Sequence, residues 1–254
     1  MIFVDLPFIP MDVLIVITQY VGYNNKYKLV QNPEKYIVYY KPDSNIIDQD
    51  LKKFKNLKYL DLEFNFKITD EGIKHMQLEI LKCNMNITDE IIKKLPLKEL
   101  YCLRNRKITD NGIKELKDLK ILYIHQNENI TDDGIKNLSI EILGVGRSVK
   151  ITDEGIKNLP LKESDCFINK NFTDNGIKNL PLEYLDVFQN TNFTDEGIKK
   201  LPLKYLNCGV NTNFTNQGLS KLPLEILRCG HNTNITREGV AHLHLKYYRN
   251  YTET

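Results

Sequence analysis

The sequence predicts an α/β fold built from stacked repeats, each contributing one short strand and one short helix. Two observations lead to this prediction: a threonine returns at a regular interval, and the residues between successive threonines repeat one apolar pattern. From Thr131 onward the interval is always 21 residues, and a sustained period of this length is typical of a stacked-repeat architecture. The recurring threonines are Thr69, Thr88, Thr109, Thr131, Thr152, Thr173, Thr194, Thr215 and Thr236.

The first half of each repeat has the pattern of a strand with one buried face. In residues 203–208, apolar side chains hold the first, fourth and sixth places, and Leu206 and Cys208 are separated by one polar residue. Asn211 then closes the segment, where a side-chain amide can bond the backbone of adjacent turns. We expect the same role for Asn65, Asn86, Asn105, Asn127, Asn169, Asn190 and Asn232, with Ser148 as the one departure.

The second half of each repeat predicts a short helix. In residues 151–160, Thr152 is the expected N-cap, and the acidic residues after it act as caps in the first turn, where the helix dipole favours them. Ile151 and Ile156 form a hydrophobic staple, and Pro160 prevents the helix from continuing. A glycine recurs in this turn, which we interpret as allowing neighbouring helices to approach closely: Gly72, Gly112, Gly134, Gly155, Gly176, Gly197, Gly218 and Gly239.

The five cysteines all occupy the sixth, inward place of the predicted strand. Aliphatic residues such as Val145 and Val187 fill the same place in other repeats, so cysteine is used there as a small apolar residue. No C-x-x-C spacing exists and the count is odd, which favours buried structural thiols over a metal site. A disulfide between adjacent strands remains an alternative for two pairs, Cys83 with Cys102 and Cys208 with Cys229, while Cys166 has no such neighbour.

Composition and motifs give no support for an enzyme. The sequence shows no Ser/His/Asp set, no glycine loop that would hold a phosphate and no cluster of metal ligands, so we expect no catalytic activity, metal or cofactor. The net charge of +2 gives no electrostatic reason to expect nucleic acid or an anionic membrane as the partner. No segment approaches the length of a membrane-spanning helix.

The N-terminus is apolar but does not have the form of a secretory signal peptide. It lacks a basic first region, carries Asp5 and Asp12, and is interrupted by Pro7 and Pro10. A cytoplasmic location is therefore expected. The alternative is a secreted protein, in which the eight Asn-x-Ser/Thr sequons would accept glycans.

The combined pattern, L-x-x-L-x-(C/L/V)-x-x-N followed by (I/F)-T-D-x-G-I-K-x-L-P, resembles the leucine-rich repeat family. It is most similar to the cysteine-containing subclass, in a shortened form, and covers residues 57–251. The resemblance implies a solenoid with a concave parallel β-sheet of about ten strands and short convex helices. A degenerate helical half-repeat from residue 46 extends the solenoid to residues 46–254, and the family implies a protein–protein interaction module.

The concave face is the predicted binding surface. The third, fifth, seventh and eighth places of each strand segment point outward, and many of them carry aromatic side chains. Apolar patches of this kind usually mark protein contacts, whereas the alternative is that the rings only pack across adjacent strands. The aromatic residues expected to contact a protein partner are Tyr59, Phe64, Tyr101, Tyr123, Phe167, Tyr184, Phe188, Tyr205 and Tyr247.

Residues 1–45 depart from the repeat and are expected to form a small helical region. Their apolar stripe resembles the first helix of an F-box, which implies binding to a Skp1-like adaptor of a cullin-type ubiquitin ligase. Such F-box/leucine-rich-repeat proteins occur in giant DNA viruses, in which case the cytoplasm would be that of the host. The alternatives are an N-terminal cap on the first repeat and a stand-alone scaffold without a role in ubiquitin transfer. The matching residues are Leu6, Pro7, Val13, Leu14, Ile17, Tyr20 and Val21.

Overall fold

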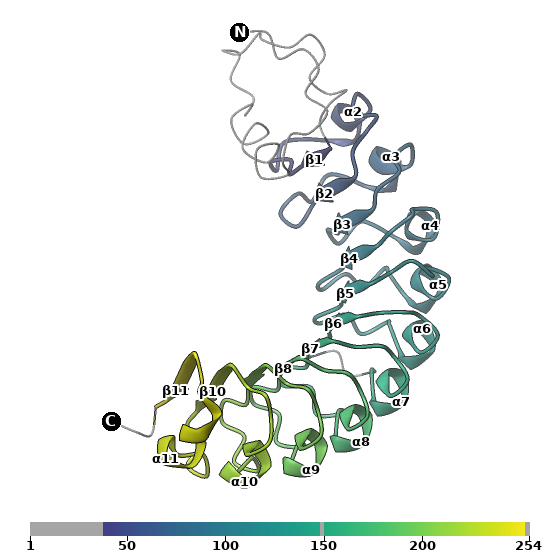
Figure 1. The fold of residues 1–254 in the computed structure, drawn as a ribbon. Helices are drawn as coiled ribbons and strands as arrows, with labels where there is room; N and C mark the ends of the chain where they lie inside the picture. The colour runs from purple at the N-terminus through teal and green to yellow at the C-terminus, as the bar shows by residue number, and fades with distance from the viewer. Residues whose placement is uncertain (1–37, 148–149, 252–254) are drawn as a thin grey trace, which may run out of the picture.

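The computed structural model describes residues 38–147 and 150–251 and shows one parallel sheet that follows the chain in strict order from β1 to β11 (Figure 1). The register is constant from β1 to β10, so that Tyr184, Leu185 and Asp186 face Tyr205, Leu206 and Asn207, and it shifts once between β10 and β11, after Arg228. The predicted α/β solenoid is confirmed. The strands are β1 (Tyr39–Tyr40), β2 (Tyr59–Asp61), β3 (Ile80–Lys82), β4 (Glu99–Tyr101), β5 (Ile121–Tyr123), β6 (Ile142–Gly144), β7 (Glu163–Asp165), β8 (Tyr184–Asp186), β9 (Tyr205–Asn207), β10 (Ile226–Gly230) and β11 (Tyr247–Asn250).

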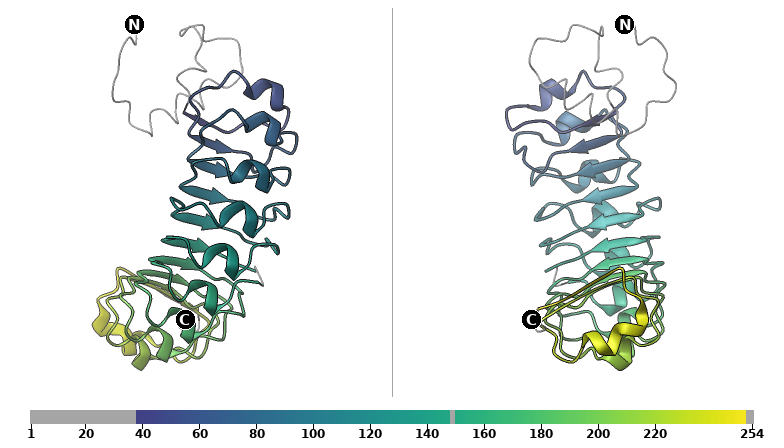
Figure 2. Two further views of the ribbon diagram at one scale, coloured as in Figure 1. Left: turned by 90° about the vertical axis from the view of Figure 1, so that its right-hand side faces the viewer. Right: turned by 60° about the vertical axis from the view of Figure 1, so that its left-hand side comes forward.

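One short helix follows each of the strands β1 to β10. The sheet lines the inner side of the arc and the helices cover its outer side, as views from the side also show (Figure 2). The helices are α2 (Asp48–Leu51), α3 (Asp70–Ile73), α4 (Asp89–Ile92), α5 (Asp110–Ile113), α6 (Asp132–Ile135), α7 (Asp153–Ile156), α8 (Asp174–Ile177), α9 (Asp195–Ile198), α10 (Asn216–Leu219) and α11 (Arg237–Val240), with a 3₁₀ turn η2 (Ala241–Leu243).

Strand β1 gives the sheet one strand more than the ten expected from sequence, and it lies before residue 46. It pairs with β2 through Tyr39 and Tyr40, and the Val38 carbonyl accepts hydrogen bonds from the backbone of Lys58 and Tyr59, both at 2.9 Å. The segment was not recognised as a strand because an aromatic residue replaces the usual inward leucine. The Tyr40 ring packs on Phe54 with ring centroids 4.6 Å apart.

The core is a continuous column of inward side chains from successive turns. Leucine fills the fourth place of most strands, and from β2 to β10 the sixth place holds an aliphatic residue or a cysteine. All five cysteines are buried and carry free thiols, which confirms their interpretation as structural residues. The two pairs on adjacent strands, Cys83 with Cys102 and Cys208 with Cys229, are not bonded to each other.

A ladder of buried asparagines connects successive turns, as predicted. The Nδ2 group of Asn211 donates to the carbonyl oxygens of Asn190 at 2.7 Å and Phe193 at 3.0 Å in the preceding turn. Its Oδ1 accepts from the Asn213 backbone at 2.8 Å. Asn211 and Asn190 are completely buried, so the amides satisfy backbone groups that water cannot reach.

One member of this ladder was assigned wrongly from sequence. Asn84, not Asn86, is the buried member, and its Nδ2 donates to the Asn65 carbonyl at 2.6 Å and the Ile68 carbonyl at 2.9 Å. The loop after β3 is shortened, so counting from the strand selects the wrong asparagine. The buried asparagine instead keeps a constant distance in sequence to the Ile-Thr or Phe-Thr pair that follows it. Ser148, the expected departure, lies outside the described residues.

A second ladder joins the helices, and it corrects the role of the acidic residues. Thr152 is the N-cap, as predicted, and its Oγ1 accepts from the Glu154 backbone at 3.2 Å. Asp132, however, the first acidic residue of the preceding helix, binds the next turn: its Oδ1 accepts from Thr152 N at 2.8 Å and its Oδ2 from Thr152 Oγ1 at 2.6 Å. The second acidic residue, Glu154, pairs with Lys157 at 2.5 Å. The first acid is therefore a link between repeats.

The recurring glycine is explained by this link. A Cβ atom added to Gly155 would overlap the Asp132 carboxylate of the preceding helix. The close approach predicted from the glycine is thus confirmed, and its cause is the aspartate that lies against the next helix. The same contact recurs between Asp174 and Gly197.

Candidate protein-binding face

The structure places all the predicted aromatic contact residues on the strands of the concave sheet or in the loops directly after them. Phe64 and Tyr247 are exposed, with 64% and 40% of their surfaces accessible, and the others are half-buried. The predicted adaptor-binding residues, Leu6, Pro7, Val13, Leu14, Ile17, Tyr20 and Val21, lie outside the described residues.

Most of these rings stack on a ring from the neighbouring strand. The ring centroids of Tyr184 and Tyr205 are 4.0 Å apart with an angle of 9° between the planes. The pairs Tyr101–Tyr123 and Phe167–Phe188 stack at 5.1 Å and 5.5 Å. Packing across strands, the alternative interpretation of these residues, is therefore present. Because neighbouring rings cover part of each face, ring edges and hydroxyl groups remain for contact with solvent or a partner.

Burial also affects the tyrosine hydroxyls on this face. Desolvation raises the pKa of Tyr101 and Tyr184, and hydrogen bonds from Tyr101 to Glu99 and between Tyr184 and Tyr205 act in the same direction. The hydroxyls therefore stay protonated well above neutral pH. They can serve as hydrogen-bond donors and acceptors but not as general bases near pH 7.

His125 makes a contact that the sequence analysis missed. Its Nε2 lies 3.5 Å from Asp165 Oδ2, although β6 separates their strands. The imidazole crosses β6 above Gly144 and Gly146, where an added Cβ atom would overlap Tyr123 and His125 respectively. Burial lowers the pKa of His125, and the Asp165 charge opposes this effect.

The second places of the strand segments form a separate column of charged residues, whose sign alternates except where Lys98 and Lys120 are neighbours. Glu141 accepts from Lys120 at 3.2 Å and from Lys162 at 2.6 Å, so that one acid pairs with the lysines of both neighbouring turns. Similar pairs join Glu79 to Lys58 and Lys98. These exposed pairs contribute little stability, but they give every glutamate of this column a lysine partner.

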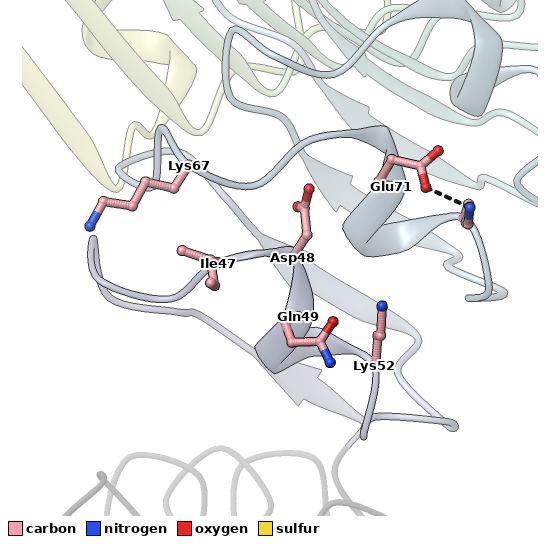
Figure 3. A pocket seen from close by; sticks show the side chains of 7 residues that line it. Ile47, Asp48, Gln49, Lys52, Lys67 and Glu71 are labelled. Atoms are coloured by element: carbon pink, nitrogen blue, oxygen red, sulfur yellow. Dashed lines mark hydrogen bonds and ion pairs between the residues drawn. The ribbon is translucent and has the colours of Figure 1, made fainter.

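A shallow hollow lies away from the concave face, at the helices α2 and α3 (Figure 3). Its volume is about 380 Å³, and charged residues of both signs line it. Asp48 is already bound to Thr69, and Glu71 is paired with Lys74 at 2.5 Å. Lys67 points away from this pair (Figure 3). The hollow holds no nucleophile next to a base.

Across residues 38–147 and 150–251, no group of three or more His, Cys, Asp or Glu side chains is placed to hold a metal ion. Within the same ranges, no helix has both the length and the apolar character needed to cross a bilayer.

Comparison with known proteins supports the repeat assignment. A family model described as leucine-rich repeat matches residues 55–75 and 178–201. No curated protein matches this sequence. These matches fall in the second turn and in the α8–α9 region, both within the array of repeats.

Solved structures share the fold at low sequence identity. A chain of the yeast Rad7 and Elc1 complex is 16% identical and has a TM-score of 0.62, with coverage of 82% of this chain and 66% of that chain. A chain of the complex of TLR13 with ssRNA13 is 19% identical with a TM-score of 0.50, and covers 76% of this chain and 34% of that chain. This chain thus spans just under two thirds of the first protein and about one third of the second.

Proposed function

We propose that this chain, a leucine-rich repeat protein, is a non-enzymatic binding module whose protein partner lies against the concave sheet. The observation that carries the proposal is the row of aromatic side chains at outward places, with Phe64 and Tyr247 the most exposed of them. Tyrosine and phenylalanine are common at the centres of protein interfaces. The fold neighbour from the Rad7 and Elc1 complex is itself held in a protein assembly.

Replacing Tyr184, Phe188 and Tyr205 together with serine is expected to weaken partner binding by at least about a hundredfold, since aromatic anchors often contribute 2 kcal/mol or more each. Their side chains are half-buried at outward places, so the fold should remain. Binding is measured by affinity purification followed by titration with the purified partner. The matched control replaces the exposed residues Lys200 and Lys221, which follow α9 and α10, with serine. Unchanged binding by the aromatic variant would place the interface elsewhere.

We further propose that residues 1–37 connect the repeats to a Skp1-like adaptor, which would make the chain a substrate-recruiting subunit of a cytoplasmic ubiquitin ligase. The resemblance of Leu6, Pro7, Val13 and Ile17 to an F-box helix supports this role. The structure shows where to cut the chain, because β1 and the loop after it belong to the solenoid. Lys41 pairs with the buried Asp61 at 3.1 Å, and the Asp43 carbonyl accepts from Asn65 at 2.7 Å.

Deletion of residues 1–37 is expected to abolish pull-down of the adaptor and to leave the thermal unfolding midpoint unchanged. Deletion of residues 1–45 additionally removes β1, the Lys41 partner of Asp61 and the Asp43 partner of Asn65, so we expect a loss of about 2–4 kcal/mol in stability. Calorimetry and pull-down with the full chain as reference check both outcomes. Aggregation of the shorter deletion would instead show that residues 1–37 are a cap, and failure of the full chain to recover the adaptor would exclude the F-box role.

A secreted recognition protein is the second candidate. The sequons support it only if glycans are attached before the chain folds, because folding engages the sequon residues. In the folded chain, Asn192 donates through Nδ2 to the Lys170 carbonyl at 2.5 Å, and Phe193 is buried. Thr194 Oγ1 donates to Asp174 Oδ2 at 2.6 Å. All three residues of the sequon are therefore engaged. Mass spectrometry of the native protein distinguishes the candidates by the presence or absence of glycans.

A further inference from the structure

The fifth places of the strand segments form a column along the middle of the concave face, and in its C-terminal half the charges do not alternate. In the C-terminal half, Asp165 and Asp186 lie side by side on β7 and β8, and Arg228 and Arg249 lie side by side on β10 and β11, with Asn207 between the pairs. Like charges opposite each other on neighbouring strands destabilise a sheet. The second-place column of the same strands avoids this arrangement by alternating lysine and glutamate.

The two carboxylates are fixed in position, and neither has a lysine or arginine of the described residues within ion-pair distance. Asp165 Oδ1 accepts from the Phe167 backbone at 3.1 Å, and its Oδ2 lies 3.5 Å from His125 Nε2. Asp186 accepts from the Phe188 backbone at 3.0 Å and from Asn207 Nδ2 at 2.9 Å. Burial raises the pKa of Asp186 and the Asp165 charge adds to this effect, while these hydrogen bonds and the Arg228 charge oppose it. By contrast, Asp61 in the same column contacts two lysines within the chain.

The two arginines are also held in place without an acidic partner among the described residues. The Arg228 guanidinium lies 5.8 Å from the ring centroid of Tyr205 and 5.5 Å from that of Tyr247. Arg249 lies 4.5 Å from the ring of Tyr251. Both arginines are exposed, so their remaining N–H donors are available for a carboxylate.

We propose that this column selects the charge pattern and the direction of the bound partner: an extended protein segment places a Lys or Arg at Asp165 and Asp186 and an Asp or Glu at Arg228 and Arg249. The proposal rests on the proposed function of the concave face and specifies the chemistry of its ligand. The centres of the two pairs are three strand spacings apart, or about 14 Å. In an extended segment this distance corresponds to about four residues, which places both charges on the same side of the segment.

The stacked rings of Tyr184 and Tyr205 lie on β8 and β9 in the third-place column, beside Asp186 and Asn207, and provide the apolar contact of the same segment. In the free chain, the like charges of each pair repel each other. An opposite charge from the partner offsets this repulsion and so favours binding. Fixed side chains lose little freedom on binding, so they favour one orientation of the segment over its reverse.

The test is a selection of random 16-residue peptides displayed on phage against the full-length protein. A variant with Asp165→Arg, Asp186→Arg, Arg228→Asp and Arg249→Asp has the same net charge but the opposite polarity. The matched control exchanges a neutralised pair in the second-place column, Glu183→Lys with Lys204→Glu. The wild type and the control are expected to select a basic and an acidic residue about four positions apart, in one order. The polarity variant should select the opposite order and bind the wild-type peptides about tenfold more weakly.

The outcomes separate this proposal from the proposed function. One outcome is that the selected peptides show no charge pattern and yet lose binding to the Tyr184, Phe188 and Tyr205 variant. This result would support the concave face as the binding surface and overturn the proposed charge polarity. A charge spacing of nine or ten residues would overturn the extended conformation, because it matches the rise of a helix. Failure of the aromatic variant to affect any selected peptide would overturn both proposals.

Discussion

Raising the pH from 9 to 10 is expected to lower the free energy of unfolding by about 4 kcal/mol, or about 1 kcal/mol for each of four buried thiols. Desolvation raises the pKa of Cys102 to about 12 from the usual 9.0. The same cause holds the pKa values of Cys83, Cys166 and Cys208 well above 9.0. These thiols stay protonated in the folded chain at pH 10, whereas they ionise in the unfolded chain.

The direction of the effect follows from these shifts. Well below pH 9 the thiols are protonated in both states, so their contribution to stability does not change with pH. As the pH approaches and passes 9, the unfolded chain releases protons that the folded chain keeps, and stability falls until the folded thiols also ionise. Raised pKa values of Tyr59, Tyr101, Tyr123 and Tyr184 act in the same direction from about pH 10. The comparison therefore ends at pH 10.

Denaturant unfolding at pH 7.5, 9 and 10 measures this dependence. The control variant carries valine at Cys83, Cys102, Cys166 and Cys208, because valine already occupies the same inward place at Val145 and Val187. We expect the variant to fold at pH 7.5 and to lose most of the decrease between pH 9 and 10. Equal losses in the two proteins would show that the thiols do not cause the alkaline instability.

Replacing Asn211 with alanine is expected to cost about 3–5 kcal/mol, because it leaves three backbone groups without their hydrogen-bond partner. These groups are the carbonyls of Asn190 and Phe193 and the N–H of Asn213. Asn211 is completely buried, so water cannot replace the amide without opening the turn. The loss should be largest in the turns next to the substitution, where hydrogen exchange of the backbone amides would detect it.

The matched control is Asn213→Ala, only two residues away. Asn213 also donates a hydrogen bond to the preceding turn, from Nδ2 to the Thr191 carbonyl at 2.6 Å, but it is exposed. Since water can take its place, we expect a loss below about 1 kcal/mol. Similar losses in the two variants would mean that burial does not determine the strength of the asparagine ladder.

Much of the fold could be predicted from the sequence because each residue type recurs for a local reason. Thr152 is the N-cap, Cys102 faces the core and Asn211 bonds the preceding turn, as the repeated pattern indicated. The outward aromatic residues of the concave face were also located correctly, because the side chains of a strand alternate between its two faces.

Contacts between turns were harder to predict, because a repeat shows which residues recur but not which of them meet. Asp132 was interpreted as a cap of its own helix, whereas it binds Thr152 of the next one. The contact between His125 and Asp165 spans two strands and depends on the glycines of β6. The T-D-x-G spacing was the available signal for the first contact. No local pattern indicates the second.

Along each strand, inward and outward residues alternate: the inward residues maintain the fold, and the outward residues form the concave face. In β8, Leu185 maintains the core, while Tyr184 and Asp186 on either side of it lie on the concave face. Substitutions at the outward places can therefore accumulate without much loss of stability, and under the proposed function they would change recognition one strand at a time. If such repeats are duplicated, the copies can keep the same fold while the ligands they bind diverge. The reason is that the residues that support folding and those that would determine specificity occupy different positions of the same three-residue strand.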